Sequence, residues 1–182
     1  MLENLEKPED LFNIKPLGGD HPFIAEQVQR GADIVKALSG ESMCFYTMFC
    51  PLSYLRLQIG WDKMMEYIRE NPEAVKFACD VIAEDVKALV KGLLEAGCDG
   101  VFYAVQNAEI NRFTVEEYNE WVRPGDKKVL DYANTLGSHN ILHCCGWEDV
   151  RNHLEVWEDY ESGAVNWAAY IGIPLALAAG GT

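Results

Sequence analysis

The chain has 182 residues, of which 49% are hydrophobic and 24% are charged, as in a folded domain rather than a disordered or low-complexity chain. Its 29 acidic residues outnumber its 15 basic ones, and the net charge of −14 argues against binding to nucleic acid or to an anionic membrane. We expect no secretory signal and no membrane span, and the six cysteines lack paired extracellular spacing, so a cytoplasmic location is expected.

Helical and β-rich stretches alternate along the chain. The first half contains a helical period over Pro22 to Leu38, an apolar and aromatic run over Met43 to Phe49, a short helix over Asp62 to Glu70 and a longer one from Pro72. The second half contains a β-rich run over Asp99 to Val105, helical sequence from Thr114 to Leu136, a strand over Asn140 to Cys144, a helix over Trp147 to Tyr160 and a strand over Ala164 to Ala168.

Local signals mark several helix ends. Asn71 is placed to cap the longer helix at its start, and Gly97 stands where a glycine commonly follows a helix. Thr114 and Glu117 match a capping box, in which each side chain binds the other residue's backbone N–H. Pro124 divides the helical sequence after Thr114 into two pieces.

Strands that alternate with helices pair in parallel, so we predict a parallel α/β fold. Four strands are compatible with an open flavodoxin-like sheet and with part of a (β/α)8 barrel, and periodicity does not choose between them. In both folds the functional groups lie at the carboxyl ends of the strands. That rule selects four segments, which are Cys50 to Tyr54, Gln106 to Arg112, His143 to Trp147 and Asn166 to Tyr170.

His143 and Cys145 stand two residues apart at the end of a predicted strand. Alternate strand residues face the same side, so both side chains can enter one cavity while Cys144 points away. Imidazole and thiolate are preferred zinc ligands, and a catalytic zinc ion takes three protein ligands and one open position. The alternative is a buried cysteine beside a hydrogen-bonded histidine, and the spacing identifies no third ligand.

The loop after the second predicted strand concentrates polar groups. Gln106, Asn107 and Glu109 can orient a polar substrate, and the planar guanidinium of Arg112 can hold a carboxylate. The alternative is a solvated loop that precedes the next helix.

Taken together, these segments resemble the uroporphyrinogen decarboxylase superfamily, which includes zinc-dependent methyltransferases that act on corrinoid proteins. The resemblance covers roughly residues 22 to 170 and rests on an ordered set of segments. They are the Pro-containing turn Phe49 to Ser53, Glu95 to Phe102, Glu117 and Tyr118, Val122 to Pro124, Ile141 to His143 before a Cys-Gly pair, and Val165 to Trp167.

The resemblance implies that the four strands are about the third to the sixth of a (β/α)8 barrel. A complete barrel typically takes about 250 residues. Residues 1–182 are therefore expected to form a single, incomplete domain of this type.

For function, the resemblance favours an enzyme of the methyltransferase branch, which moves a methyl group between a corrinoid and a thiol. It implies zinc held by His143 and Cys145 and a pocket lined by the Gln106 to Glu109 loop and by Asn166. A corrinoid protein is an expected partner, and a homodimer is a further expectation.

Two alternatives remain open. The first is a cofactor-free uroporphyrinogen decarboxylase, a lyase of porphyrin biosynthesis acting on a tetrapyrrole. The resemblance aligns a tyrosine and a serine of the decarboxylase with Leu57 and Ala104 of this chain, and these two differences argue against this alternative. The second alternative is a truncated, non-catalytic fragment that binds a tetrapyrrole or a corrinoid partner.

Overall fold

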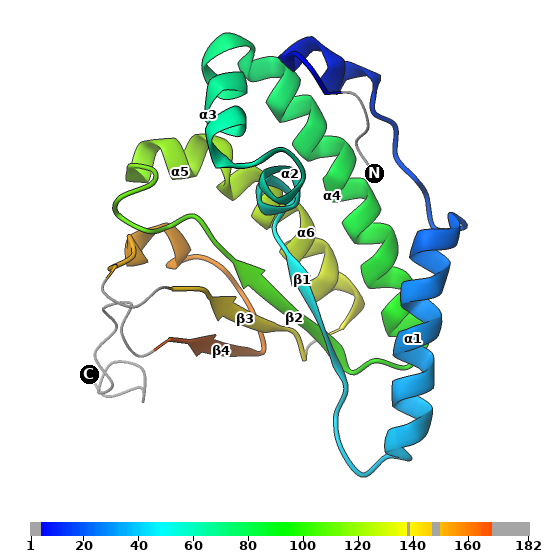
Figure 1. The fold of residues 1–182 in the computed structure, drawn as a ribbon. Coiled ribbons are helices and arrows are strands. Elements are labelled where there is room, and N and C mark those ends of the chain that lie inside the picture. The colour runs from blue at the N-terminus through cyan, green and yellow to red at the C-terminus, as the bar shows by residue number, and fades with distance from the viewer. Residues whose placement is uncertain (1–4, 138, 147–149, 169–182) are drawn as a thin grey trace, which may run out of the picture.

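A computed structural model describes residues 5–137, 139–146 and 150–168 of the chain. Their centre is one sheet of four parallel strands in the order β1-β2-β3-β4 (Figure 1). The strands are β1 (Phe45–Phe49), β2 (Gly100–Val105), β3 (Ile141–Cys144) and β4 (Ala164–Trp167). The predicted parallel α/β fold is therefore confirmed, with each predicted strand present within two residues of its expected limits.

Helical segments connect and cover the strands. They are η1 (Pro8–Asn13), α1 (Pro22–Leu38), α2 (Pro51–Ile59), α3 (Trp61–Glu70), α4 (Pro72–Glu95), α5 (Val115–Trp121), α6 (Arg123–Leu136) and η2 (Leu154–Trp157). Helix α2 is a correction, because its sequence suggested only a turn at Pro51. Proline is well tolerated at the first position of a helix, where no backbone hydrogen bond is lost, and Pro51 occupies that position.

The predicted helix ends are confirmed. The Asn71 side chain accepts a hydrogen bond from the backbone of Ala74. Both bonds of the capping box form, at 3.2 Å from Glu117 N to Thr114 Oγ1 and at 2.8 Å from Thr114 N to Glu117 Oε2. Gly97 has φ of +100°, the left-handed conformation that ends α4.

The helix predicted over Trp147 to Tyr160 is wrong for the part that the structure describes. Residues 147–149 lie outside it, and from residue 150 onward the only helical segment described is the short η2. The preceding backbone pairs with the loop after β2 instead. Ile110 donates to the carbonyl of Arg151, and His153 donates to the carbonyl of Ala108. These bonds use backbone groups that a helix would need for itself.

The two faces of the sheet differ. The α1, α4 and α6 helices lie together on one side (Figure 1). Tyr103 is buried on that side, because its hydroxyl contacts Asp126 of α6, and Leu142, which pairs with Tyr103, shares that face with Cys144. Residues paired across parallel strands share a face, so Ala104, His143 and Asn166 form a row on the opposite face. That face is the one that would line the interior of a barrel.

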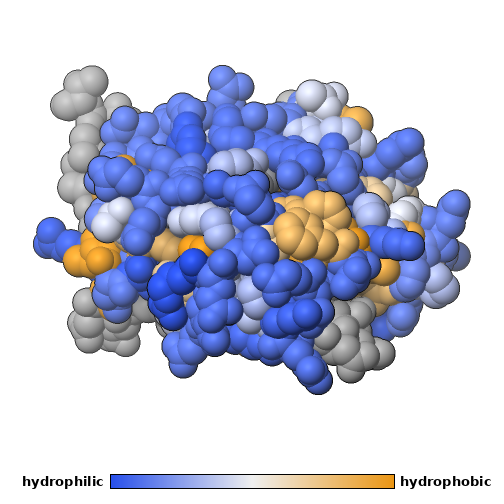
Figure 2. Space-filling view, turned by 90° about the horizontal axis from the view of Figure 1, so that it is seen from above, coloured by the Kyte–Doolittle hydropathy of each residue, from blue (hydrophilic) through white to orange (hydrophobic). Residues whose placement is uncertain are grey.

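The surface seen in Figure 2 is mostly hydrophilic, with hydrophobic atoms confined to small groups. This agrees with the strongly acidic composition. Within the described residues, no helix combines the length and the apolar character that crossing a membrane would require.

Candidate functional site

His143 lies in the row of side chains on the sheet face away from the helices. Its Nδ1 atom is 2.6 Å from Oδ1 of Asn166 on β4, and its ring stacks on Phe102 with a centroid distance of 4.8 Å. An amide oxygen only accepts hydrogen bonds, so this contact places the proton on Nδ1. The other ring nitrogen, Nε2, then carries a lone pair that is available to a ligand.

Cys145 follows β3 and continues its pairing with β2. Its backbone N–H donates to the carbonyl of Val105 at 3.0 Å, and its thiol lies beside Gln106. Burial raises the pKa of Cys145 to about 11, although the Gln106 side chain opposes that rise. Cys144 is buried among the core residues, as the alternation along a strand predicts.

Asn107 connects the loop after β2 to helix α2. It is fully buried and has φ of +70°, a conformation that asparagine tolerates better than most residues. Its Nδ2 donates to Ser53 Oγ at 3.1 Å, and its Oδ1 accepts from Arg112 Nη1 at 3.4 Å. These contacts make Asn107 a positioning residue for the loop.

Glu109 is a buried carboxylate, only 2% exposed. Its Oε1 lies 3.4 Å from Nε of Arg112, whose guanidinium stacks over the ring of Trp61. Its Oε2 has no hydrogen-bond partner among the residues that the structure describes. An unsatisfied buried carboxylate oxygen is costly, which makes it a candidate acceptor for a ligand or a water molecule. Residues 107–109 of this loop are therefore buried, whereas Ile110 and Asn111 are exposed to solvent.

The loop lies beside three residues of the segment after β1, of which the sequence analysis had not selected Arg56. Arg56 Nη2 donates to Oε1 of Gln106 at 2.9 Å, and the Cys50 thiol lies 2.9 Å from Ser53 Oγ. The strand-end rule had selected the segment that holds Cys50 and Ser53. Arg56 was missed because helix α2 was not predicted. In that helix, Arg56 lies close enough to the carboxyl end of β2 to contact Gln106.

The residues present fit a zinc ion in part. His143 and Cys145 offer the right donor atoms at the end of one strand, and Asn166 fixes the ring as outer hydrogen-bond partners of metal ligands do. Among residues 5–137, 139–146 and 150–168, no three His, Cys, Asp or Glu side chains are grouped closely enough to hold a metal ion. A third ligand is not identified in that part of the chain.

Comparisons with known proteins agree with this architecture. The family model described as uroporphyrinogen decarboxylase (URO-D) matches residues 2–167. No curated protein matches the chain. Among solved structures, a methyltransferase from Methanosarcina mazei matches with a TM-score of 0.61 and 16% identity, over 76% of this chain and 40% of that one.

The likeness to the Methanosarcina mazei protein concerns the fold. This chain spans about 40% of the length of that structure, and 76% of this chain takes part in the match. The expectation of a partial (β/α)8 barrel is therefore confirmed, in preference to an open flavodoxin-like sheet.

Proposed function

Because the chain belongs to the uroporphyrinogen decarboxylase family, a family of enzymes, we propose that it carries part of the active site of a zinc-dependent methyltransferase. In this proposal His143 and Cys145 hold the metal, and at least one further ligand comes from outside the described residues. When bound, zinc would keep a substrate thiol deprotonated and so make it nucleophilic.

The observation that carries the proposal is the hydrogen bond between His143 and Asn166. At 2.6 Å it orients the imidazole and assigns its proton to Nδ1. Metal-binding histidines typically have such a partner on the second ring nitrogen. The bond leaves Nε2, on the sheet face opposite α1, α4 and α6, as the ring atom that would bind the metal.

The neighbouring loop would bind the substrate. Gln106 lies between Arg56 and the Cys145 thiol, so it can position a polar group next to the metal. Glu109 offers its unpartnered Oε2 to a hydrogen-bond donor, and Arg112 supplies a positive charge beside it. We propose a thiol and a corrinoid-bound methyl group as the reactants, with a corrinoid protein as the partner.

A cofactor-free decarboxylase acting on a tetrapyrrole is the second candidate, favoured by the description of the matching family. Two positions do not support it. Leu57, where the resemblance would place a tyrosine, is 60% exposed and has no hydroxyl group. The nearby Tyr54 uses its hydroxyl to accept a hydrogen bond from the backbone of Phe49.

Cobalt binding tests the metal site without requiring turnover. The 182-residue chain is titrated with Co²⁺ while the thiolate-to-cobalt absorption in the ultraviolet is recorded. We expect a saturable band in the unaltered chain that Cys145→Ala abolishes. The matched control is Cys144→Ala, which removes the adjacent thiol on the opposite face and should leave the band intact.

If Cys145→Ala binds Co²⁺ as tightly as the unaltered chain, with the same absorption, the zinc assignment is wrong. Decarboxylation of a tetrapyrrole that survives a strong chelator would establish the second candidate instead.

A further inference from the structure

Two cysteines lie close together at the amino ends of the strands, opposite the candidate site. Cys44 precedes β1 and Cys98 precedes β2, 54 positions apart in the sequence, and their sulfur atoms are 3.9 Å apart. Both are buried, with exposed fractions of 8% and 5%. The sequence offered no reason to treat them as more than core residues.

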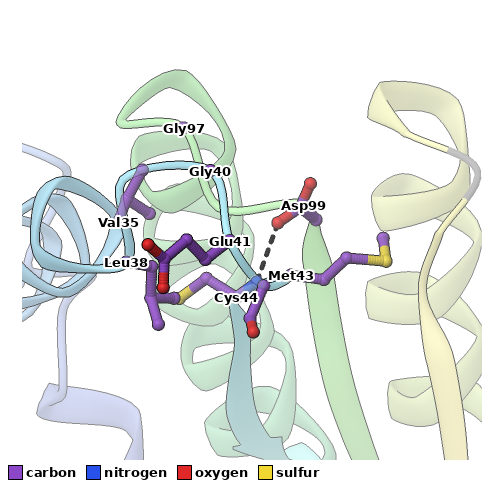
Figure 3. A pocket seen from close by; sticks show the side chains of 9 residues that line it. Val35, Leu38, Gly40, Glu41, Met43, Cys44, Gly97 and Asp99 are labelled. Carbon is purple, nitrogen blue, oxygen red and sulfur yellow. Dashed lines mark hydrogen bonds between the residues drawn. The ribbon is translucent and has the colours of Figure 1, made fainter.

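The backbone holds this arrangement in place. Asp99 N donates to the carbonyl of Cys44 at 2.9 Å, and the Asp99 carboxylate accepts from Cys44 N at 2.7 Å (Figure 3). Directly after them, Phe45 pairs with Gly100 at the start of the β1-β2 ladder. The distance between the two thiols is therefore set by strand register and by a side chain that bridges the two loops.

A hollow of about 350 Å³ lies beside Cys44. Its lining includes Glu41, Met43 and Cys44 from the segment before β1, and Gly97 and Asp99 from the loop before β2 (Figure 3). Cys44 is the cysteine that lines it. Cys98 lies behind, with its sulfur 3.3 Å from where a Cβ on Gly31 would stand.

We propose that Cys44 and Cys98 are an oxidation site, which a small hydroperoxide entering the hollow converts into a disulfide. The Cys44 thiolate attacks the peroxide oxygen, the O–O bond breaks, and Cys44 becomes a sulfenic acid as hydroxide leaves. The Cys98 thiolate then attacks the Cys44 sulfur and expels a second hydroxide. With the two thiol protons, the products are one disulfide and, from hydrogen peroxide, two water molecules.

The environment suits Cys98 to the second step. Burial raises its pKa to about 11, and the Cys44 thiol and the Asp99 carboxylate add to that rise. At neutral pH it is therefore mostly a thiol, which protects it from direct attack. Once Cys44 is oxidised, the short distance compensates for the small thiolate fraction, because groups held together react as if at very high concentration.

The disulfide would join the α1-β1 loop to the α4-β2 loop. A covalent link between distant residues restricts the unfolded chain and thereby stabilises the folded one. We expect the oxidised chain to melt roughly 5 °C or more above the reduced one. Because the link forms at the opposite ends of the strands, Co²⁺ binding at Cys145 should be unchanged, so this proposal and the proposed function can fail separately.

Peptide mapping of the unaltered chain tests the proposal. The reduced protein is treated with hydrogen peroxide, alkylated, digested without reductant and analysed by mass spectrometry. We expect a peptide pair joined between Cys44 and Cys98 that disappears on reduction, together with the rise in melting temperature. Cys79, half-buried on α4, serves as the internal reference and should remain alkylatable.

Single variants complete the test. Cys44→Ser and Cys98→Ser should each lose the linked peptide and the peroxide-induced rise in melting temperature, whereas Cys79→Ser should keep both. Sulfinic or sulfonic acid at Cys44 without any link to Cys98 would overturn the proposal. So would a link from either cysteine to another partner.

Discussion

The Nδ1 atom of His143 lies 2.6 Å from the Oδ1 atom of Asn166, across two adjacent parallel strands. His143 and Asn166 are paired across the parallel strands β3 and β4. The backbone hydrogen bonds between these strands therefore keep the two side chains next to each other. This contact decides which ring nitrogen of His143 is available to the proposed metal ion.

If His143 binds a metal ion as proposed, replacing Asn166 should weaken that binding without removing a ligand. Outer hydrogen-bond partners of metal ligands typically contribute 10- to 100-fold in affinity, so Asn166→Ala should weaken Co²⁺ binding by about 10-fold or more. Asn166→Asp keeps an acceptor oxygen and should retain most of the affinity. The titration described above measures both.

The neighbouring Val165→Ala is the control for that measurement. Val165 alternates with Asn166 along β4 and is 48% exposed, so its truncation should change Co²⁺ affinity by less than about twofold. Equal effects of Asn166→Ala and Val165→Ala would contradict the role given to the hydrogen bond.

Asn107 should prove important for stability as well as for the site. Asn107→Gly removes the bonds to Ser53 and Arg112 while keeping the positive φ, and we expect a loss of about 1–3 kcal/mol. Asn107→Ala adds a backbone penalty of about 1 kcal/mol, because a Cβ is unfavourable at φ of +70°. Urea unfolding at constant pH measures both changes.

The same loop offers a matched control in Asn111, which is exposed. Asn111→Ala should change the free energy of unfolding by no more than about 0.5 kcal/mol. An Asn107→Ala variant as stable as Asn107→Gly would show that the left-handed conformation carries no strain.

Asp126 should make stability depend on pH near neutrality. Its buried carboxylate accepts hydrogen bonds from the hydroxyls of Tyr118 at 2.8 Å and Tyr160 at 3.0 Å, with Tyr103 at 3.4 Å. These bonds favour the charged form, but burial is the larger effect and raises the pKa of Asp126 to about 7. The folded chain therefore holds this proton more tightly than the unfolded chain does.

The direction in which the free energy of unfolding changes with pH follows from this difference in proton binding. A carboxyl with a raised pKa contributes stability that is complete below its unfolded pKa of about 4 and is lost as pH rises through about 7. Relative to Asp126→Asn, the unaltered chain should lose about 2–3 kcal/mol of unfolding free energy between pH 5 and pH 7.5. Urea unfolding at the two pH values measures it, and a difference that stays constant or grows with pH would refute the assignment.

Much of the fold could be predicted because its signals are local. The helical period of α1 and the caps at Asn71 and Thr114 depend on residues within a few positions of one another, and the structure reproduces them. The helix predicted over Trp147 to Tyr160 failed for the opposite reason. Its backbone pairs with residues 108 to 110, which lie far away in the sequence.

The sequence by itself determined the alternation of strands and helices, the family, and the presence of His143 and Cys145 at the end of one strand. Only the tertiary structure decided which residues surround them. It brought Asn166 to His143, Arg56 to Gln106 and Ser53 to Asn107, across separations of 23 to 54 positions. Such contacts depend on strand register and on the path of the intervening helices, and no local periodicity encodes either.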